Sequence, residues 1–321
     1  MDQSHPLKGT VVANESDSQG IVVHRSKNLV IAFMALYILL ALLVIVGNTF
    51  VIVAFKRVRT RRAINIFFVS LAVSDLMVGA VSIPLWIYIL SFPYFTSSVE
   101  PNQKVVDFHR SFDVFSALAS ISNLVAIAIE RQYAICWPIK HKASSFTRFY
   151  SMILAVWSYS LIITVFYSLP LSPSWEQEYR SVLSFTAGFV IPVIVIIAAY
   201  SSIYIRVRSM SNFWKSTSAR SSLRINVQQE KRTAMTVVIV AVLFLLAWLP
   251  FFVVTMLYSF YRASLPDEGS GFTSLLDFVK WMHYSNSIVN PLIYTYRSQQ
   301  IRKMLGILLL RLTGRQRQGR P

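Results

Sequence analysis

Two acidic residues stand inside long apolar stretches of the sequence, where an ionised side chain is costly and is therefore a candidate functional group. These residues are Asp75 and Asp113. Asn286 and Asn290 are four residues apart, so they share one face of a helix and could supply oxygen ligands beside Asp75, together with Ser120. This set predicts a site for a hard cation such as sodium. The alternative is a hydrated carboxylate that only fixes helix packing.

Asp113 has two interpretations as well. Its carboxylate either pairs with Lys280 or serves as the counter-ion for the ammonium group of a ligand. Arg131 follows eighteen residues later, so on a helix both side chains share one face, about 27 Å apart along the axis. Glu230 and Trp248 repeat this separation. The two spacings predict an outer cavity coupled to an inner Glu230–Arg131 pair, as a signal-transmitting switch requires.

The sequence around these residues has the composition of a membrane protein. Of its 321 residues 55% are hydrophobic and 14% are charged, and the mean hydropathy is +0.52, whereas a soluble domain carries about a quarter charged residues. This composition excludes intrinsic disorder. The single cysteine and five scattered histidines exclude a disulfide framework and a structural zinc site. The net charge of +17 lies in short runs between apolar segments, which argues against nucleic acid as a partner.

Seven segments are long enough to cross about 30 Å of hydrocarbon as helices. We expect the third to score poorly on hydropathy, because its first half contains Asp107, His109, Arg110 and Asp113. With the N-terminus outside, 23 of the 31 Lys and Arg fall in cytoplasmic segments, as the positive-inside rule requires. We therefore predict an all-α, multi-pass plasma-membrane protein, a seven-transmembrane helix bundle with an extracellular N-terminus and a cytoplasmic C-terminus. The predicted spans are 29–54, 64–90, 105–130, 149–170, 181–205, 233–259 and 273–296.

The segments that flank the bundle are assigned from their polarity. Residues 1–28 form an extracellular tail, in which Asn14 heads a glycosylation sequon. The first 25 residues are polar, so the first span serves as the insertion signal. Residues 297–321 form a basic cytoplasmic tail, and the apolar spacing in its first half predicts a short amphipathic helix on the inner leaflet.

Over residues 29–310 the chain resembles the rhodopsin-like (class A) G-protein-coupled receptors. The motifs that carry the resemblance are Gly47-Asn48, Leu71-Ala72-Val73-Ser74-Asp75-Leu76, Glu130-Arg131-Gln132, Trp157, Pro192 with Tyr200, Phe244-Leu245-Leu246-Ala247-Trp248-Leu249-Pro250 and Asn290-Pro291-Leu292-Ile293-Tyr294. The resemblance implies a receptor in the lipid bilayer that binds a small extracellular ligand and activates a heterotrimeric G protein. It implies no enzyme activity and no cofactor. The one bound ion that it allows is an allosteric sodium ion. The implied switch and G-protein-coupling residues are Glu130, Arg131, Glu230, Tyr200, Ile121, Pro192, Phe244 and Tyr294.

Within this family the chain looks most like the biogenic-amine receptors. Asp113 stands at the ammonium-binding position, and the aromatic residues near it would add cation–π attraction to the ion pair. The alternative for these aromatics is ordinary core packing. The implied ligand-binding residues are Asp113, Ser184, Trp248, Phe251, Phe252, Lys280, Trp281 and Tyr284.

Two departures from the family pattern keep other ligands open. Val106 stands where family members carry the cysteine of an outer disulfide, and Lys280 places a second cation beside an ammonium site. Both favour a class A receptor for a zwitterionic amino-acid derivative, a nucleoside, a lipid or a peptide. A retinal-binding opsin is disfavoured, because Tyr284 occupies the position of the Schiff-base lysine. A transporter is the remote alternative, and the sequence shows no internal repeat of the kind that many transporters have.

Overall fold

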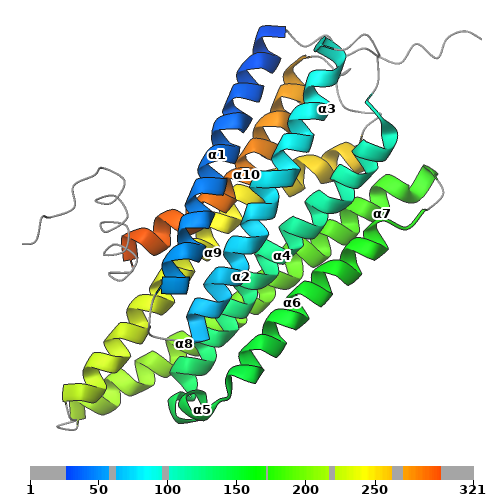
Figure 1. Ribbon diagram of the computed structural model, residues 1–321. Coiled ribbons are helices and arrows are strands. Elements are labelled where there is room, and N and C mark those ends of the chain that lie inside the picture. Colours follow the sequence, from blue (N-terminus) through cyan, green and yellow to red (C-terminus); the bar gives the residue numbers. More distant parts are fainter. Residues whose placement is uncertain are drawn as a thin grey trace, which may run out of the picture.

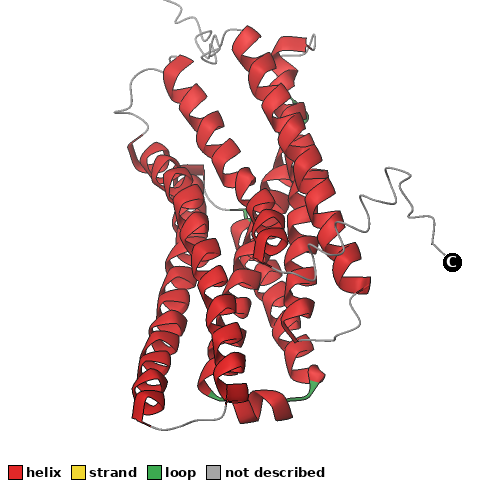
Figure 2. Cartoon of the chain, turned by 90° about the vertical axis from the view of Figure 1, so that its left-hand side faces the viewer, coloured by secondary structure: helices red, strands yellow, loops and turns green. Residues whose placement is uncertain are grey.

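The computed structural model describes residues 27–57, 63–95, 101–170, 173–216, 221–261 and 270–297. Every element in these ranges is helical (Figure 2), as the all-α prediction requires. The predicted glycosylation site at Asn14 and the predicted C-terminal amphipathic helix lie outside the described residues. The elements are α1 (Lys27–Arg57), α2 (Ala63–Met77), η1 (Val78–Ser82), α3 (Ile83–Phe95), α4 (Gln103–Cys136), α5 (Pro138–Ala143), α6 (Phe146–Tyr167), α7 (Pro173–Phe185), η2 (Thr186–Val190), α8 (Ile191–Ser216), α9 (Ser221–Tyr261) and α10 (Ser270–Arg297).

Seven long helical rods make up the described bundle, and two of them consist of two α-helices joined by a π-helical turn. The turn η1 joins α2 to α3, and η2 joins α7 to α8. Each turn ends two residues before a proline, Pro84 in α3 and Pro192 in α8. Proline lacks the N–H that the preceding turn would use, so the hydrogen-bond ladder has to be rearranged there. Pro250 and Pro291 lie inside α9 and α10.

The weak membrane span is the seventh and not the third. The expectation that the third span would score poorly is wrong: α4 contains an apolar window with a mean hydropathy of 1.8. Its charged side chains lie in its first turns, up to Asp113, and near its end, at Glu130 and Arg131, and the stretch between them is mostly apolar. Six rods in the described residues are apolar enough to be spans, and α10 is not among them. At 28 residues, α10 is still about 42 Å long, and its polarity comes from inward-facing side chains.

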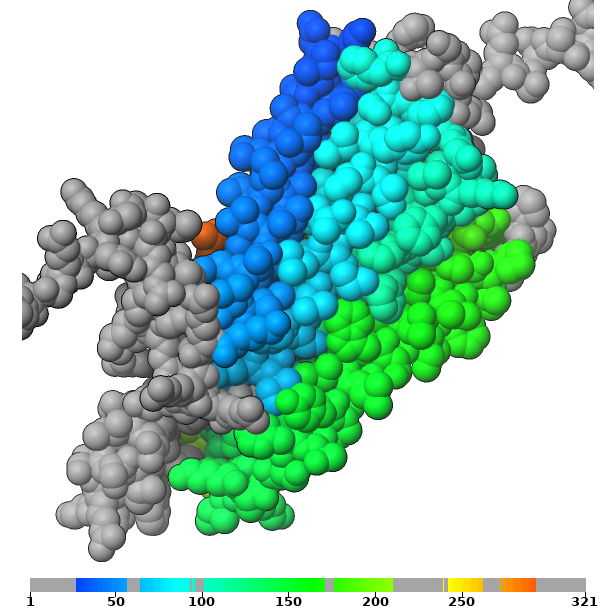
Figure 3. Space-filling model, in the orientation of Figure 1, coloured from blue at the N-terminus to red at the C-terminus, as the bar shows by residue number. Residues whose placement is uncertain are grey.

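Helix α4 occupies the middle of the bundle and packs against α2, α6, α8 and α9 (Figure 1). Helix α1 packs against α2, α3 and α10, and α1, the α2–α3 rod and α6 form one continuous face (Figure 3). Large apolar side chains such as Leu42, Leu154 and Ile194 are exposed, whereas Asn48 and Asp75 are buried. A soluble protein usually buries such apolar side chains and exposes the polar ones. The opposite arrangement is expected where lipid surrounds the protein.

Small and polar residues hold α1 close to its neighbours. A Cβ atom at Gly79 in η1 would lie 2.7 Å from Cγ1 of Val44, so this approach requires glycine. The Nδ2 of Asn48 donates to the carbonyl oxygens of Val44 and Ser287, each at 3.0 Å. Close approach through small residues and interhelical hydrogen bonds is the usual way to join membrane helices. These contacts position α10, which carries much of the site.

Candidate functional site

A cavity of about 250 Å³ lies between α3, α4, α7, α9 and α10. Its walls include six of the eight predicted ligand-binding residues: Asp113, Ser184, Trp248, Phe251, Phe252 and Lys280. Trp281 and Tyr284 are not part of the lining. Tyr284 is fully buried, with its ring 6.1 Å from that of Tyr37 in α1, and Trp281 packs into the same cluster of apolar side chains. Further wall residues, which the sequence did not single out, are Trp86, His109, Arg110, Tyr167, Arg180, Thr255 and His283.

Asp113 and Lys280 face each other across the cavity wall. The Nζ of Lys280 is 3.3 Å from Oδ2 of Asp113 and 4.0 Å from the centre of the Trp86 ring. The second carboxylate oxygen, Oδ1, is buried and has no hydrogen-bond partner. The ion pair that was one of the two interpretations of Asp113 is therefore present. It leaves one oxygen of the carboxylate without a hydrogen-bond donor.

The deep end of the cavity is an aromatic floor made of Trp248, Phe251, Phe252 and His283. The Trp248 ring centre lies 3.9 Å from that of His283, and Trp248 stacks on Phe252 at 5.5 Å. The indole N–H of Trp248 and Nδ1 of His283 are buried without hydrogen-bond partners. The floor thus joins α9 to α10 by ring contacts and contains two buried polar atoms that have no hydrogen-bond partner.

Two of the hydroxyl groups on the other walls, those of Ser184 and Thr255, are engaged within their own helices. Ser184 donates to the carbonyl oxygen of Ser181 at 3.1 Å, and Thr255 donates to that of Phe251 at 2.7 Å. Such local bonds are common for serine and threonine in helices. The part of the cavity near these residues therefore favours apolar groups.

His109 and His283 were not predicted as ligand-binding residues, because a single histidine in a sequence is weak evidence for a site. A signal was available in their spacing. His109 precedes Asp113 by four residues and His283 follows Lys280 by three, so each shares a helix face with one member of the ion pair. In the structure the His109 ring stacks on Trp86 at 5.7 Å.

Asp75 joins three helices below the aromatic floor. Its side chain is fully buried. Ser120 of α4 donates to Oδ1 and Asn290 of α10 donates to Oδ2, both at 2.8 Å. The Oδ1 atoms of Asn286 and Asn290 are buried without hydrogen-bond partners. The described residues contain no group of three or more His, Cys, Asp or Glu that could hold a metal. The side chains around Asp75 offer oxygen atoms with one carboxylate, which are the donors that hard cations prefer.

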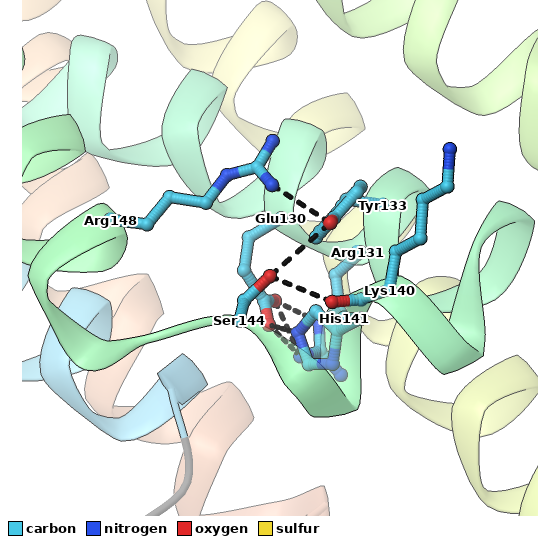
Figure 4. A network of polar contacts seen from close by, with 7 residues as sticks. All are labelled: Glu130, Arg131, Tyr133, Lys140, His141, Ser144 and Arg148. Carbon is cyan, nitrogen blue, oxygen red and sulfur yellow. Dashed lines mark hydrogen bonds and ion pairs between the residues drawn. The ribbon is translucent and has the colours of Figure 1, made fainter.

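At the end of α4 that is distant from the cavity, Glu130 is nearly completely buried and forms a two-point ion pair with Arg131 (Figure 4). The Nε2 of His141 in α5 lies 2.9 Å from Oε1 of Glu130. This contact ties the short helix α5 to the end of α4. The side chain of Glu230 is not among those described, so the Glu230–Arg131 pair stays a prediction.

A second layer of contacts surrounds this inner network, which we define as Glu130, Arg131 and His141. Arg148 donates to the hydroxyl of Tyr133 at 2.8 Å, and this hydroxyl lies 3.2 Å from Oγ of Ser144 (Figure 4). Ser144 also donates to the carbonyl oxygen of Lys140. The loop between α5 and α6 is thereby held against α4.

The remaining predicted switch residues are spread along the bundle. Phe244 is fully buried beside the aromatic floor, and Ile121 is buried at the cavity wall. Tyr200 packs between α4 and α8, with its hydroxyl buried and without a hydrogen-bond partner. Pro192 follows η2 at the start of α8. The side chain of Tyr294 lies outside those that the structure describes.

Comparison with known proteins agrees with this architecture. The family model described as 7 transmembrane receptor (rhodopsin family) matches residues 47–294. The D(1C) dopamine receptor of Xenopus laevis is 26% identical, over 81% of this chain and 64% of that receptor. The alpha-1D adrenergic receptor of Homo sapiens is 28% identical, over 94% and 60%, and trace amine-associated receptor 1 of Mus musculus is 28% identical, over 86% and 89%.

The chain spans less than two thirds of the length of the dopamine and adrenergic receptors named above. The family match covers most of the chain and includes all seven rods of the bundle, from within α1 to within α10. The chain belongs to the rhodopsin family of seven-transmembrane receptors.

Proposed function

We propose that this protein is a plasma-membrane receptor that activates a heterotrimeric G protein when a small extracellular ligand with an ammonium group binds its cavity. The observation that carries the proposal is the unpartnered Oδ1 of Asp113 at the wall of this cavity. An ammonium group at this oxygen would form a charge-assisted hydrogen bond in surroundings of low dielectric constant. The aromatic floor would add cation–π attraction. The names of the dopamine, adrenergic and trace amine relatives support the same ligand class.

Lys280 weakens such an ammonium site without abolishing it. A ligand ammonium about 3 Å from Asp113 is attracted by roughly 5 kcal/mol at an effective dielectric constant of 20. If it lies about 6 Å from Nζ of Lys280, it is repelled by roughly 3 kcal/mol. The attraction is larger, so a cation can bind beside Lys280, although with less affinity than at an unpaired carboxylate.

The proposed orientation places the N-terminus outside the cell and the C-terminus in the cytoplasm. Its support is the distribution of charge, with 23 of the 31 Lys and Arg in the segments assigned to the cytoplasm. The ligand cavity then opens toward the outside, and the inner network of Glu130, Arg131 and His141 faces the G protein.

A panel of small primary amines tests the proposed function in cells that express the chain, with G-protein activation as the readout. We expect at least one amine to give a saturable response that cells without the receptor lack. Surface expression is measured in the same cells with an epitope tag. A receptor that is present at the surface and silent toward every amine, and toward the amino acids from which these amines derive, would contradict the proposed ligand class.

We further propose that Asp75, Ser120, Asn286 and Asn290 bind a sodium ion that favours the inactive state. Sodium should then lower agonist affinity about fivefold or more, the usual size of an allosteric coupling. Asp75→Asn should abolish this dependence, because it removes the one carboxylate of the set. The measurement is agonist competition binding in sodium chloride and in potassium chloride of equal ionic strength. A sodium effect of unchanged size in Asp75→Asn would refute the assignment.

The inner network predicts a change in basal signalling. Glu130→Ala removes the acid that holds both Arg131 and His141, and we expect it to shift the resting equilibrium toward the active state by about 1–3 kcal/mol. Ligand-independent G-protein activation should therefore rise several-fold at matched surface expression. Arg148→Ala is the control, since it cuts the outer contact with Tyr133 and leaves Glu130 and Arg131 in place. Equal basal activity in all three receptors would argue against a lock.

A further inference from the structure

The ligand-binding cavity is positively charged as well as aromatic. Its lining contains three cationic side chains, Arg110, Arg180 and Lys280, and one acid, Asp113, within the part of the chain that the structure describes. A simple amine therefore enters against an excess of like charge. Resting on the ammonium site proposed above, we propose that the natural ligand also carries an acid group, which Lys280 binds: the ligand is a zwitterion of the α-amino-acid type with an apolar or aromatic side chain.

The acids that neighbour the two arginines lie outside the lining. The Nη1 of Arg110 is 3.6 Å from Oδ1 of Asp107, and Nη1 of Arg180 is 2.5 Å from Oε1 of Glu176. Asp107 has a side chain that is 56% exposed, and that of Glu176 is 32% exposed, so water screens both acids. Both acids pair with their arginines from the outer side, and the side chain of Arg110 is itself 41% exposed, so Lys280 is the cation that bears most directly on a ligand beside Asp113.

Lys280 has unused binding capacity. Its side chain is 14% exposed, and Nζ lies over the rings of Trp86 and Tyr284 at 4.0 and 5.6 Å. An ammonium group has three donors, but Asp113 Oδ2 is the single oxygen recorded beside Nζ among the described residues, at 3.3 Å. That distance exceeds the roughly 2.7–2.9 Å of a charge-assisted hydrogen bond. A ligand carboxylate would supply the missing acceptor.

The ion pair matches the head of an α-amino acid in both charge and spacing. Asp113 and Lys280 hold opposite charges 3.3 Å apart, and an α-amino acid carries its ammonium and carboxylate on one carbon atom, at a similar separation. Laid antiparallel to the pair, the ligand places its ammonium on the unpartnered Oδ1 of Asp113 and its carboxylate on Nζ of Lys280. The four charges then alternate, and no net charge is added to a site of low dielectric constant. A simple amine would leave one positive charge uncompensated.

The rest of the cavity selects the ligand's side chain. The aromatic floor lies at the deep end, and the hydroxyls of Ser184 and Thr255 donate within their own helices. A volume of about 250 Å³ admits a single amino acid and not a long peptide. An aromatic or branched apolar side chain on the floor therefore satisfies the site better than a polar one.

Matched ligand pairs that differ only in the carboxylate test this inference. The pairs are phenethylamine with phenylalanine, tyramine with tyrosine, and tryptamine with tryptophan, and G-protein activation is the readout. We expect the amino acid of at least one pair to be about tenfold or more potent than its amine, as one added charge-assisted hydrogen bond predicts. Both members are measured on the same cells, so the potency ratio does not depend on receptor number.

Variants of Lys280 test whether the potency ratio of amino acid to amine depends on the ion pair of Lys280 with Asp113. Lys280→Met should lower amino-acid potency about tenfold or more and leave the amine unchanged or more potent, which abolishes or reverses the preference for the amino acid. Lys280→Arg keeps the charge and should keep the preference for the amino acid. Lys104→Met is the matched control, because Lys104 is an exposed cation near the start of α4 that does not line the cavity. If Lys280→Met does not reach the surface, Lys280→Gln gives the same comparison with a side chain that still donates to Asp113.

The outcomes separate the two proposals. Amines that are as potent as their parent amino acids in the wild-type receptor would overturn the zwitterion and leave the ammonium site standing. Equal losses for amine and amino acid in the Lys280 variants would overturn the role of Lys280 in binding the acid group. Silence toward both members of every pair, with the receptor at the surface, would overturn the ammonium site together with the zwitterion.

Discussion

Asp113→Asn is expected to lower the affinity of the activating ligand by about 2–5 kcal/mol, which is roughly thirtyfold or more. The change keeps the volume of the side chain and removes the charge that an ammonium group would meet at Oδ1, which is buried and unpartnered in the structure. It also leaves Lys280 buried beside a neutral amide, so a bound cation would meet repulsion without the compensating attraction. Agonist dose–response curves, normalised to surface expression, measure the loss.

Asp107→Asn is the matched control for this experiment. It makes the same chemical change on the same helix, at an exposed acid whose partner is Arg110 at 3.6 Å, and surface ion pairs contribute at most about 1 kcal/mol. Potency should therefore change little. Because Lys280 loses its partner in Asp113→Asn, the number of folded receptors should also fall. Retained potency in Asp113→Asn would remove the ammonium site and leave the receptor fold.

Trp248→Ala is expected to destabilise the receptor by about 3–5 kcal/mol. Trp248 is 4% exposed and contacts Phe244, Phe252 and His283 with ring centres 3.9–5.5 Å apart. Its removal opens a void between α9 and α10 that these neighbours cannot close. Thermal unfolding of the purified receptor should show a midpoint lower by roughly 6–10 °C, and the agonist response should be lost with the floor of the cavity.

Leu246→Ala on the same helix separates packing inside the bundle from contact with lipid. Leu246 is 61% exposed, so lipid or detergent fills the space that its side chain leaves, and the stability should change by about 0.5 kcal/mol or less. Similar midpoints for the two variants would show that the floor does not hold α9 against α10. A normal agonist response in Trp248→Ala would show that the ligand does not reach the floor.

The transmembrane helices could be placed from the sequence because a bilayer imposes a length and an apolar composition on each span. The boundaries differ where the chain extends beyond the hydrocarbon. The fifth span was predicted to begin at residue 181, but α7 begins at Pro173, where proline suits the first turn of a helix and Glu176 suits its positive end. The π turns η1 and η2 were also not predicted, since proline signals a break without specifying how the ladder is rearranged.

Residues that share one helix face could be paired from their spacing, as Asn286 and Asn290 were. The inner contact between Glu130 and His141 could not be predicted in this way, because α5 is a separate short helix whose direction depends on how it packs against α4. Trp281 and Tyr284 illustrate the same limit. They follow Lys280 and His283 in the sequence, yet their rings pack against α1 and α3 and do not line the cavity, because neighbouring positions on a helix point about 100° apart. The hydroxyl of Tyr284 reaches α4, where it lies 3.4 Å from Nε2 of His109.

Composition, charge distribution and motif spacing were therefore sufficient for the seven-helix bundle and for the choice of Asp75, Asp113 and Lys280 as chemically important. These properties are local, since each follows from the cost of a charge or a polar backbone in hydrocarbon. The ion pair of Asp113 with Lys280 depended on the rotation of α10 against α4, which places Nζ of Lys280 3.3 Å from Oδ2 and leaves Oδ1 without a hydrogen-bond partner. That rotation results from side-chain packing between helices that are distant in the sequence, such as the contact of Asn48 with Ser287, and no local pattern encodes it.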